Sequence, residues 1–321
     1  MKDQFGRRIN YLRISVTDKC NLRCTYCMPE EGLEWVPKDE LLTYEEITEI
    51  VAQMAGMGLE RVRITGGEPL VRQDLPELVR MLSDVAEIED LSLSTNAVLL
   101  PRFAAELADA GLHRVNISLD TLRRDRFETI ARRPARFYDA TLEGIEAAVE
   151  TGFDPVKINA VMMRDLNDDE FADFARTTRE RPWHVRFIEL MPVGRNLHLT
   201  DHFLPASEML ERVESIGDLE PVEGPVGNGP ARYFSFPDAA GTVGVITPLS
   251  HNYCDRCNRV RLTAEGGLRT CLFGDHQVDL KTPLRETGDV RPAVRRALGE
   301  KQERHFLQLG SDRGSGGLQA L

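Results

Sequence analysis

The sequence predicts an α/β fold, a partial TIM-like (βα)6 barrel followed by an appended C-terminal α+β domain. Two observations lead to this prediction. Up to about residue 217, six strand-like segments alternate with helix-like segments. Beyond that point the alternation stops, and short strand-like pieces separated by turn-forming residues follow. We therefore expect a barrel domain over residues 1–217 and a second domain over residues 218–321.

The expected strands are rich in β-branched and alternating residues, and they cover 11–16, 61–65, 91–95, 113–119, 156–162 and 184–190. Helical patterns lie between them at 44–57, 74–86, 101–110, 138–151 and 168–180. The first helix opens with a capping signal, in which Thr43 is followed by Glu46. Strands that alternate with helices form parallel βαβ units with right-handed crossovers. Because about eight such units close a barrel, six are expected to leave it open.

The C-terminal part has shorter and less regular elements. We expect a helix at 206–216, a Gly/Pro-rich loop at 223–230, strands near 242–246 and 258–263, a helix around 289–299, and a flexible glycine-rich tail over 310–317.

Composition indicates a globular protein. Hydrophobic residues make up 41% of the chain and charged residues 29%, and no apolar run approaches the ~18 residues of a membrane span. The start, Met1 to Gln4, has no apolar stretch behind a basic region, so we expect no signal peptide and a cytoplasmic location. The net charge of −12 disfavours nucleic-acid binding by bulk electrostatics, although local arginines could still hold a small phosphorylated ligand.

The six cysteines form two groups of three, which are Cys20, Cys24 and Cys27, and Cys254, Cys257 and Cys271. Groups of three do not pair evenly into disulfides, and cytosolic chains seldom keep disulfides, so both groups point to metal. The first group follows the first expected strand, at the strand end where α/β barrels place their chemistry. Three thiolates can hold three irons of a cubane cluster and leave one iron open. A zinc site completed by another ligand is the alternative.

A resemblance supports the cluster. The pattern C-x3-C-x2-C, with Tyr26 before its last cysteine, resembles the radical S-adenosylmethionine superfamily, and Thr65-Gly66-Gly67-Glu68-Pro69 resembles the second motif of that superfamily. There the open iron is chelated by S-adenosylmethionine, which the reduced cluster cleaves to a 5′-deoxyadenosyl radical. The glycines would let backbone polar groups approach the methionine ammonium closely. A plain tight turn at Gly66 and Gly67 is the alternative.

The second cysteine group has two interpretations. His251 lies three residues before Cys254 and would complete a structural zinc site of three cysteines and one histidine. However, Arg259 and Arg261 follow at a spacing of two residues, so they project from one strand face, and arginine suits bidentate phosphate recognition. We therefore favour a substrate site, with two arginines on a solvated strand face as the alternative.

Two more arginines, Arg13 and Arg63, are expected to point from neighbouring strands into the open barrel, so that four arginines would converge on one polyanion. The two cysteine triads, together with the run from Asn258 to Arg261, resemble the GTP 3′,8-cyclase family of molybdenum cofactor biosynthesis. The likeness extends from Arg13 to about Leu284. It departs at the C-terminus, because chains of the family typically end in Gly-Gly, whereas four residues follow Gly317 here.

The resemblance implies two 4Fe–4S clusters and S-adenosylmethionine as cofactors. The adenosyl radical would remove hydrogen from C3′ of GTP, and the C3′ radical would close onto C8 to give 3′,8-cyclo-7,8-dihydro-GTP, with the guanine on the open iron of the second cluster. By motif, the residues that contact S-adenosylmethionine are Tyr26, Gly67, Ser118 and Met191. Those that contact GTP are Arg13, Arg63, Ser94, Lys157, Arg259, Val260 and Arg261, of which Arg259 and Arg261 are also expected to be catalytic.

The resemblance also implies an electron donor and hand-over of the product to cyclic pyranopterin monophosphate synthase, with a homodimer as a candidate assembly. Neither nucleic acid nor a membrane is expected as a partner. Two other classes of function stay open at this point. One is a radical enzyme that modifies peptides, for which the arginines would be incidental. The other is a non-catalytic zinc-binding interaction module.

Overall fold

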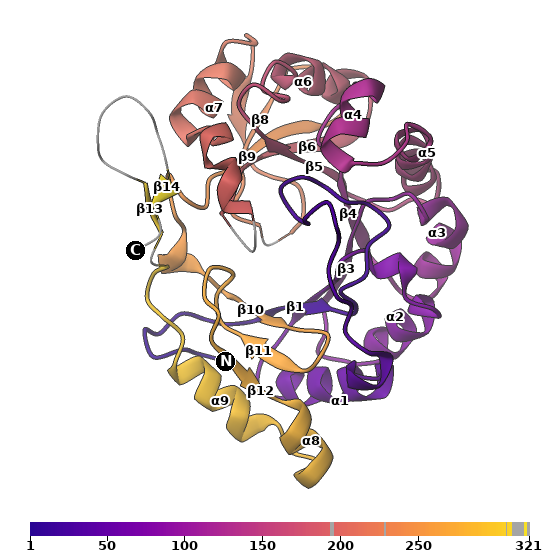
Figure 1. Cartoon of the computed structure of the whole chain (residues 1–321), viewed down its shortest axis with the longest axis vertical. Helices are drawn as coiled ribbons and strands as arrows, with labels where there is room; N and C mark the ends of the chain where they lie inside the picture. The colour runs from indigo at the N-terminus through magenta and orange to yellow at the C-terminus, as the bar shows by residue number, and fades with distance from the viewer. Residues whose placement is uncertain (193–195, 228, 306, 310–317, 320–321) are drawn as a thin grey trace.

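One curved β-sheet organises the chain. The computed structural model describes residues 1–192, 196–227, 229–305, 307–309 and 318–319. Within them a 12-stranded sheet runs in the order β12-β11-β10-β1-β2-β3-β4-β5-β6-β9-β8-β7. Figure 1 shows this sheet bent into an arc with helices along its outer side. The predicted mixed α/β fold with a partial barrel is therefore confirmed.

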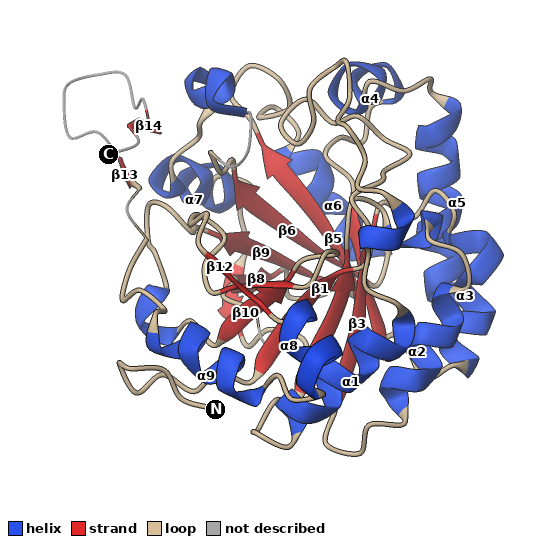
Figure 2. Cartoon of the chain, turned by 60° about the horizontal axis from the view of Figure 1, so that its bottom comes forward, coloured by secondary structure: helices blue, strands red, loops and turns tan. Residues whose placement is uncertain are grey.

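The first six strands pair in parallel and in chain order. They are β1 (Tyr11–Ser15), β2 (Arg61–Thr65), β3 (Asp90–Thr95), β4 (Arg114–Ser118), β5 (Val156–Met162) and β6 (Trp183–Glu189). Each agrees with an expected strand to within about one residue at either end, because β-branched residues and period-two alternation mark buried strands clearly. Figure 2 shows these strands side by side, with helices packed outside them.

The helices of this part are α1 (Tyr44–Ala55), α2 (Leu75–Ser83), α3 (Leu100–Asp109), α4 (Arg124–Ala131), α5 (Arg136–Glu150), α6 (Phe171–Glu180) and α7 (Ala206–Glu214), with short 3-10 turns η1 (Lys38–Glu40), η2 (Pro69–Val71) and η3 (Asn196–His202). The predicted capping box at the start of α1 is present, since the Glu46 amide donates to Thr43 Oγ1 at 3.2 Å and the Thr43 amide donates to Glu46 Oε2 at 2.9 Å. Helix α4 was not predicted, because it is short, mostly polar and has no side-chain N-cap.

The C-terminal part contains β7 (Glu220–Val222), β8 (Arg232–Ser235), β9 (Thr242–Ile246), η4 (Cys254–Arg256), β10 (Arg259–Leu262), β11 (Gly267–Arg269), β12 (Gln277–Asp279), α8 (Lys281–Thr287), α9 (Arg291–Gly299), β13 (Gln308–Leu309) and β14 (Leu318–Gln319). Its strands extend the barrel sheet at both ends, since β9 pairs in parallel with β6 and β10 with β1. They thereby cover the two edges that a six-stranded arc leaves unpaired. The division at residue 217 stays a prediction, and the tail over 310–317 lies outside the described residues.

The two faces of the sheet differ in polarity. Leu12, Ile14, Val62 and Ile64 are fully buried in the apolar core between the sheet and its helices. The residues that alternate with them face the interior of the arc, and many are polar or charged. Burying unpaired charge destabilises a protein, so a charged interior indicates that a ligand binds there. In the described part of the chain, no helix is both long and apolar enough to span a bilayer.

Candidate active site

The first cysteine group lies at the carboxyl end of β1. Cys20, Cys24 and Cys27 line one cavity of about 220 Å³. Burial raises the pKa of Cys20 to about 11. It also raises the pKa of Cys24 well above its usual range, and the negative charges of Asp120 and the two neighbouring thiolates add to this effect. Three thiolates can therefore share this space only with a strongly cationic partner, which is what a metal cluster supplies.

The arrangement of the donors distinguishes a cluster from a single ion. Within the described residues, no three His, Cys, Asp or Glu side chains converge closely enough to bind one metal ion. Cysteines that each bind a different iron of a cubane need not meet at one point. At both cysteine groups the side chains thus fit a multi-iron cluster better than the mononuclear zinc site that the sequence left open.

Helix α4 holds the cysteine loop through its backbone. The amides of Arg23 and Thr25, on either side of Cys24, donate to the carbonyls of Ala131 and Ile130 at 3.0 and 2.9 Å. In addition, Arg133 Nε donates to the Asn21 carbonyl at 2.7 Å. The two amide bonds use carbonyls at the end of α4 that have no partner within the helix. They fix the position of Cys24 from both sides.

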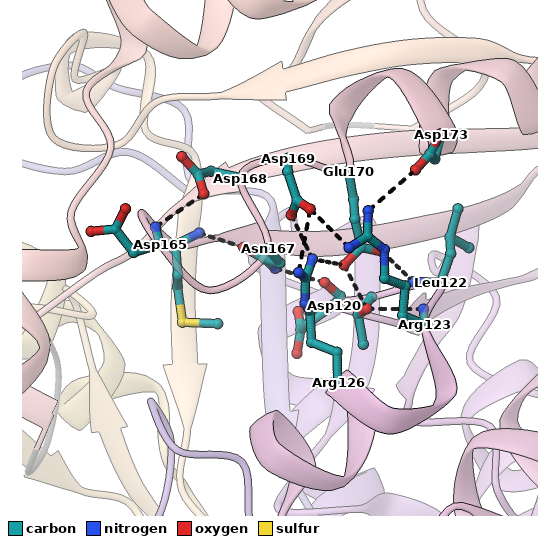
Figure 3. A network of polar contacts seen from close by, with 12 residues as sticks. Asp120, Leu122, Arg123, Arg126, Asp165, Asn167, Asp168, Asp169, Glu170 and Asp173 are labelled. Atoms are coloured by element: carbon teal, nitrogen blue, oxygen red, sulfur yellow. Dashed lines mark hydrogen bonds and ion pairs between the residues drawn. The ribbon is translucent and has the colours of Figure 1, made fainter.

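The other end of α4 is anchored by a buried carboxylate, Glu170, shown in Figure 3. Its two oxygens accept from Thr121 Oγ1 and from the Leu122 amide, each at 2.7 Å, and Arg126 on α4 also donates to it. Arg126 further pairs with Asp169 at 2.5 Å. Since Glu170 is fully buried, removing it would leave several donors unsatisfied. This network therefore fixes the position of α4, and α4 in turn fixes the position of the cysteine loop.

Tyr26, which was expected to contact S-adenosylmethionine, also has a structural partner. Its Oη donates to Asp120 Oδ2 at 2.8 Å, and Asp120 Oδ1 accepts from the Val161 amide at 2.9 Å. Burial raises the pKa of Asp120 to about 6. Sequence reasoning missed this carboxylate, although it follows Ser118 at the end of β4, where parallel strands place functional groups.

The glycine motif approaches the backbone of the cysteine loop. A Cβ on Gly67 would lie 2.3 Å from the Lys19 carbonyl oxygen, and the Gly67 amide donates to the Thr17 carbonyl at 2.7 Å. Only glycine permits this contact. Glu68, next in the motif, is buried and accepts from Thr95 Oγ1 and the Asn96 amide, each at 2.7 Å. Burial raises the pKa of Glu68 to about 7.

The structure brings most of the expected cofactor residues together. Tyr26, Gly67 and Ser118 line the cavity of the first cysteine group, and Ser94, expected at GTP, lines it too. Met191 is placed differently, since it lines the cavity of the second cysteine group.

The second cysteine group is assembled from two segments of the chain. Cys254 begins η4, Cys257 follows it before β10, and Cys271 follows β11. All three line one cavity together with Arg259 and Arg261. Burial raises the pKa of Cys254. The pKa of Cys257 is lowered, because Lys301 and Arg259 outweigh the opposite effect of burial. Cationic neighbours therefore favour thiolate here.

Cationic side chains from six strands line the interior of the arc. They are Arg13 on β1, Arg63 on β2, Arg114 on β4, Lys157 on β5, Arg186 on β6, and Arg259 and Arg261 on β10. In register, Arg13 lies beside Arg63 on one side and Arg261 on the other. Val260 between the two β10 arginines is buried in the apolar core, so only its backbone faces the interior.

These cations have few anionic partners. The Nε atoms of Arg13, Arg186 and Arg259 are buried without a hydrogen-bond acceptor among the described residues. Burial, followed by repulsion from neighbouring cations, lowers the pKa of Lys157 to about 6 and that of Arg261 to about 9. Unsatisfied buried donors are costly, so the cluster fits a polyanionic ligand that would accept from them. Sequence reasoning missed Arg114 and Arg186, although Arg186 alternates with the core residues Val185 and Phe187 as interior residues do.

Comparison with known proteins agrees with this site. The Radical SAM superfamily profile matches residues 14–178, and the Molybdenum Cofactor Synthesis C profile matches residues 183–307. Crystal structures of SuiB from Streptococcus suis share the fold, and the one bound to S-adenosylmethionine has a TM-score of 0.62 at 15% identity over 90% of this chain and 68% of that chain.

Sequence relatives are much closer. The GTP 3′,8-cyclase of Pelotomaculum thermopropionicum is 48% identical over 97% of this chain and 96% of the relative. That of Moorella thermoacetica is 46% identical over the same shares, and that of Heliobacterium modesticaldum is 51% identical over 89% of this chain and 87% of the relative. Together with the two cysteine cavities and the buried arginines, these matches show that the chain belongs to the GTP 3′,8-cyclase family of radical S-adenosylmethionine enzymes.

Proposed function

We propose that this protein converts GTP to 3′,8-cyclo-7,8-dihydro-GTP, the first step of molybdenum cofactor biosynthesis. The observation that carries the proposal is the group of buried arginines beside the second cysteine cavity, several of which have N–H groups without an acceptor among the described residues. A triphosphate supplies the acceptors and the negative charge that this group lacks. The names of the relatives give the same substrate.

Each cysteine group would hold a 4Fe–4S cluster, and the first would also bind S-adenosylmethionine with Tyr26, Gly67 and Ser118. When bound, the reduced first cluster and S-adenosylmethionine supply a 5′-deoxyadenosyl radical. The chain itself fixes the cysteine loop through α4 and closes the cavity with apolar side chains, including Phe127 and Ile130. Met191 remains a proposed contact of S-adenosylmethionine, because the adenosyl group has to reach the nucleotide and Met191 lines the nucleotide side.

The proposed contacts of GTP are Arg13, Arg63, Ser94, Lys157, Arg259, the backbone of Val260, and Arg261. Arg259 and Arg261 would orient the nucleotide so that C3′ of its ribose faces the adenosyl group, which is the sense in which we propose them as catalytic. Arg114 and Arg186 are added because they share the interior.

The test is anaerobic incubation of the reconstituted protein with GTP, S-adenosylmethionine and a strong reductant, followed by mass analysis. GTP deuterated at C3′ should transfer its label to 5′-deoxyadenosine in step with formation of the cyclised nucleotide. Cys24→Ser is the control and should form neither product. Formation of 5′-deoxyadenosine without any nucleotide product or label transfer would indicate another substrate, such as a peptide.

We further propose a cytoplasmic location, reduction by a separate electron donor, a homodimer, and hand-over of the product to cyclic pyranopterin monophosphate synthase. The hand-over follows from chemistry, because the cyclised nucleotide still needs rearrangement to a pyranopterin. The location, the electron donor and the homodimer are proposed from membership of the family.

A further inference from the structure

The second cavity contains a histidine that the spacing of the sequence does not reveal. His305 follows α9 and lines this cavity together with Cys254, Cys257 and Cys271. His251, the histidine nearest to these cysteines in sequence, is exposed and is not among the residues that line the cavity. Spatial proximity therefore selects His305 as the imidazole beside the second cysteine group.

The ring of His305 is held in one orientation. Its Nε2 lies 3.1 Å from the Pro248 carbonyl oxygen, and its ring centroid lies 4.7 Å from that of Phe273. A carbonyl can only accept, so Nε2 carries the hydrogen and Nδ1 has the free lone pair. Nδ1 is buried and has no hydrogen-bond partner among the described residues.

The backbone of His305 contacts a cysteine directly. Its backbone amide donates a hydrogen bond to Cys254. Arg7 fastens the same segment, because its guanidinium donates to the carbonyls of both Cys254 and Glu303 at 2.7 Å. The histidine and the cysteine are thus tethered side by side.

Such an arrangement is typical of a metal ligand. Histidines that bind metals usually donate the other ring N–H to a backbone carbonyl or carboxylate, which fixes the tautomer and the ring orientation. A buried acceptor without a partner destabilises the fold, and bonding to a metal would remove that cost. Three cysteines leave one iron of a cubane without a protein ligand.

We infer that Nδ1 of His305 binds this fourth iron of the second cluster while the nucleotide is absent, and that GTP displaces it. The step would be an exchange of ligands, in which the bond from Nδ1 to iron breaks, a lone pair of the nucleotide forms a bond to the same iron, and no electrons are transferred. The identity of the displacing ligand rests on the proposed function, whereas the Fe–N bond does not.

The experiment isolates the second cluster. The full chain, with Cys20, Cys24 and Cys27 changed to Ser, is labelled with 15N-histidine, reconstituted and reduced, and electron–nuclear double resonance is recorded without nucleotide. We expect a strongly coupled histidine nitrogen. The coupling should disappear in His305→Ala and in His305→Asn, whose amide can still donate to Pro248, and persist in the matched control His251→Ala. Iron content should be the same in all variants, because the three cysteines remain.

The second part of the experiment repeats the measurement with GTP. Saturating GTP should remove the nitrogen coupling, and His305→Ala should bind GTP at least as tightly as its parent. Absence of coupling in the nucleotide-free parent, or its persistence in both His305 variants, would overturn the ligation. A coupling that survives when GTP is shown to be bound, or a loss of about tenfold or more in GTP affinity in His305→Ala, would overturn the displacement. If no variant binds GTP at all, the proposed function fails, while the nucleotide-free spectra still decide the ligation.

Discussion

The two cysteine groups offer the same number of thiols in opposite electrostatic surroundings. At the first, burial and then the negative charge of Asp120 raise the pKa of Cys24 and Cys27. At the second, the positive charges of Lys301, Arg259 and Arg7 lower the pKa of Cys257 against the effect of burial. Spacing in the sequence does not distinguish the groups in this way.

The difference indicates which ligand each cavity takes. S-Adenosylmethionine has a cationic sulfonium, which carboxylates and thiolates attract, whereas a triphosphate is repelled by them. The buried arginines beside the second group have the reverse preference. The first loop is also fixed from both sides by α4 and the glycine motif, as a site for radical chemistry needs. We therefore assign cofactor cleavage to the first cavity and nucleotide binding to the second.

The largest expected effect separates the two regions completely. Cys24→Ala should abolish formation of 5′-deoxyadenosine, because the first cluster loses one of only three ligands. GTP affinity should be unchanged, and about half of the cluster iron should remain. Iron analysis, a 5′-deoxyadenosine assay and a GTP titration check this. If most of the 5′-deoxyadenosine activity survived, the assignment of the first cavity would be wrong.

Arg259→Ala and Arg261→Ala should have the converse effect. Each charge-assisted bond contributes about 1.5–3 kcal/mol, so GTP affinity or turnover should fall roughly ten- to a hundredfold for each. Cleavage of S-adenosylmethionine without GTP should continue, and iron content should not change. Arg256→Ala, an exposed arginine in η4, is the control and should bind GTP normally. If both variants converted GTP normally, Arg259 and Arg261 would not bind its phosphates.

Much of this comparison was predictable from sequence, because it rests on local patterns. The six barrel strands follow from period-two alternation, and the capping box at Thr43 begins α1 as expected. The spacing of two residues predicted that Arg259 and Arg261 share one strand face, and both line the second cavity. These features depend on residues only a few positions apart, so they can be predicted from the sequence alone.

The features that sequence analysis missed depend on long-range contacts. Asp120 accepts a hydrogen bond from Tyr26 in the cysteine loop, 94 residues earlier in the sequence. Arg114 pairs with Asp90, which lies 24 residues before it. Helix α4 is recognisable only through its anchors, since its own sequence is short and charged. His305 lies against Pro248, 57 residues away in the sequence, so spacing near the cysteines does not reveal it. Parallel sheets create such pairs, because neighbouring strands are separated by whole helices.

Lys157→Met should weaken GTP binding by about tenfold at low pH, and less as the pH rises. In the nucleotide-free protein, burial followed by Arg186 and Arg114 lowers the pKa of Lys157 to about 6 from 10.5. A bound triphosphate favours the cation and so raises that pKa. Below pH 6 the lysine is already charged, whereas above pH 6 GTP binding must take up a proton, so the affinity conferred by Lys157 falls as pH increases.

Calorimetry of GTP binding in buffers of different ionisation enthalpy measures this proton uptake. The γ-phosphate of GTP also titrates near neutral pH, but it contributes equally to the parent and to Lys157→Met, so the difference between them isolates the lysine. Equal proton uptake by the two proteins at pH 7.5–8 (about two units above the lowered pKa) would show that Lys157 does not change its charge when GTP binds, and would contradict this prediction.

The smallest effect concerns how α4 positions the first loop. Arg133→Ala removes one bond to the Asn21 carbonyl, while the backbone bonds of Arg23 and Thr25 to α4 remain. A single partly buried bond of this kind contributes about 1–2 kcal/mol, so the KM for S-adenosylmethionine should rise several-fold. The electron paramagnetic resonance line shape of the first cluster should broaden, because the loop samples more positions, and GTP affinity should not change.

Arg124→Ala on the outer side of α4 breaks only an exposed pair with Asp139, at 2.8 Å, and should alter none of these. If Arg133→Ala instead matched Arg124→Ala in KM and spectrum, the backbone bonds alone would fix the loop, and the rigidity of the first region would not depend on the arginine that follows α4.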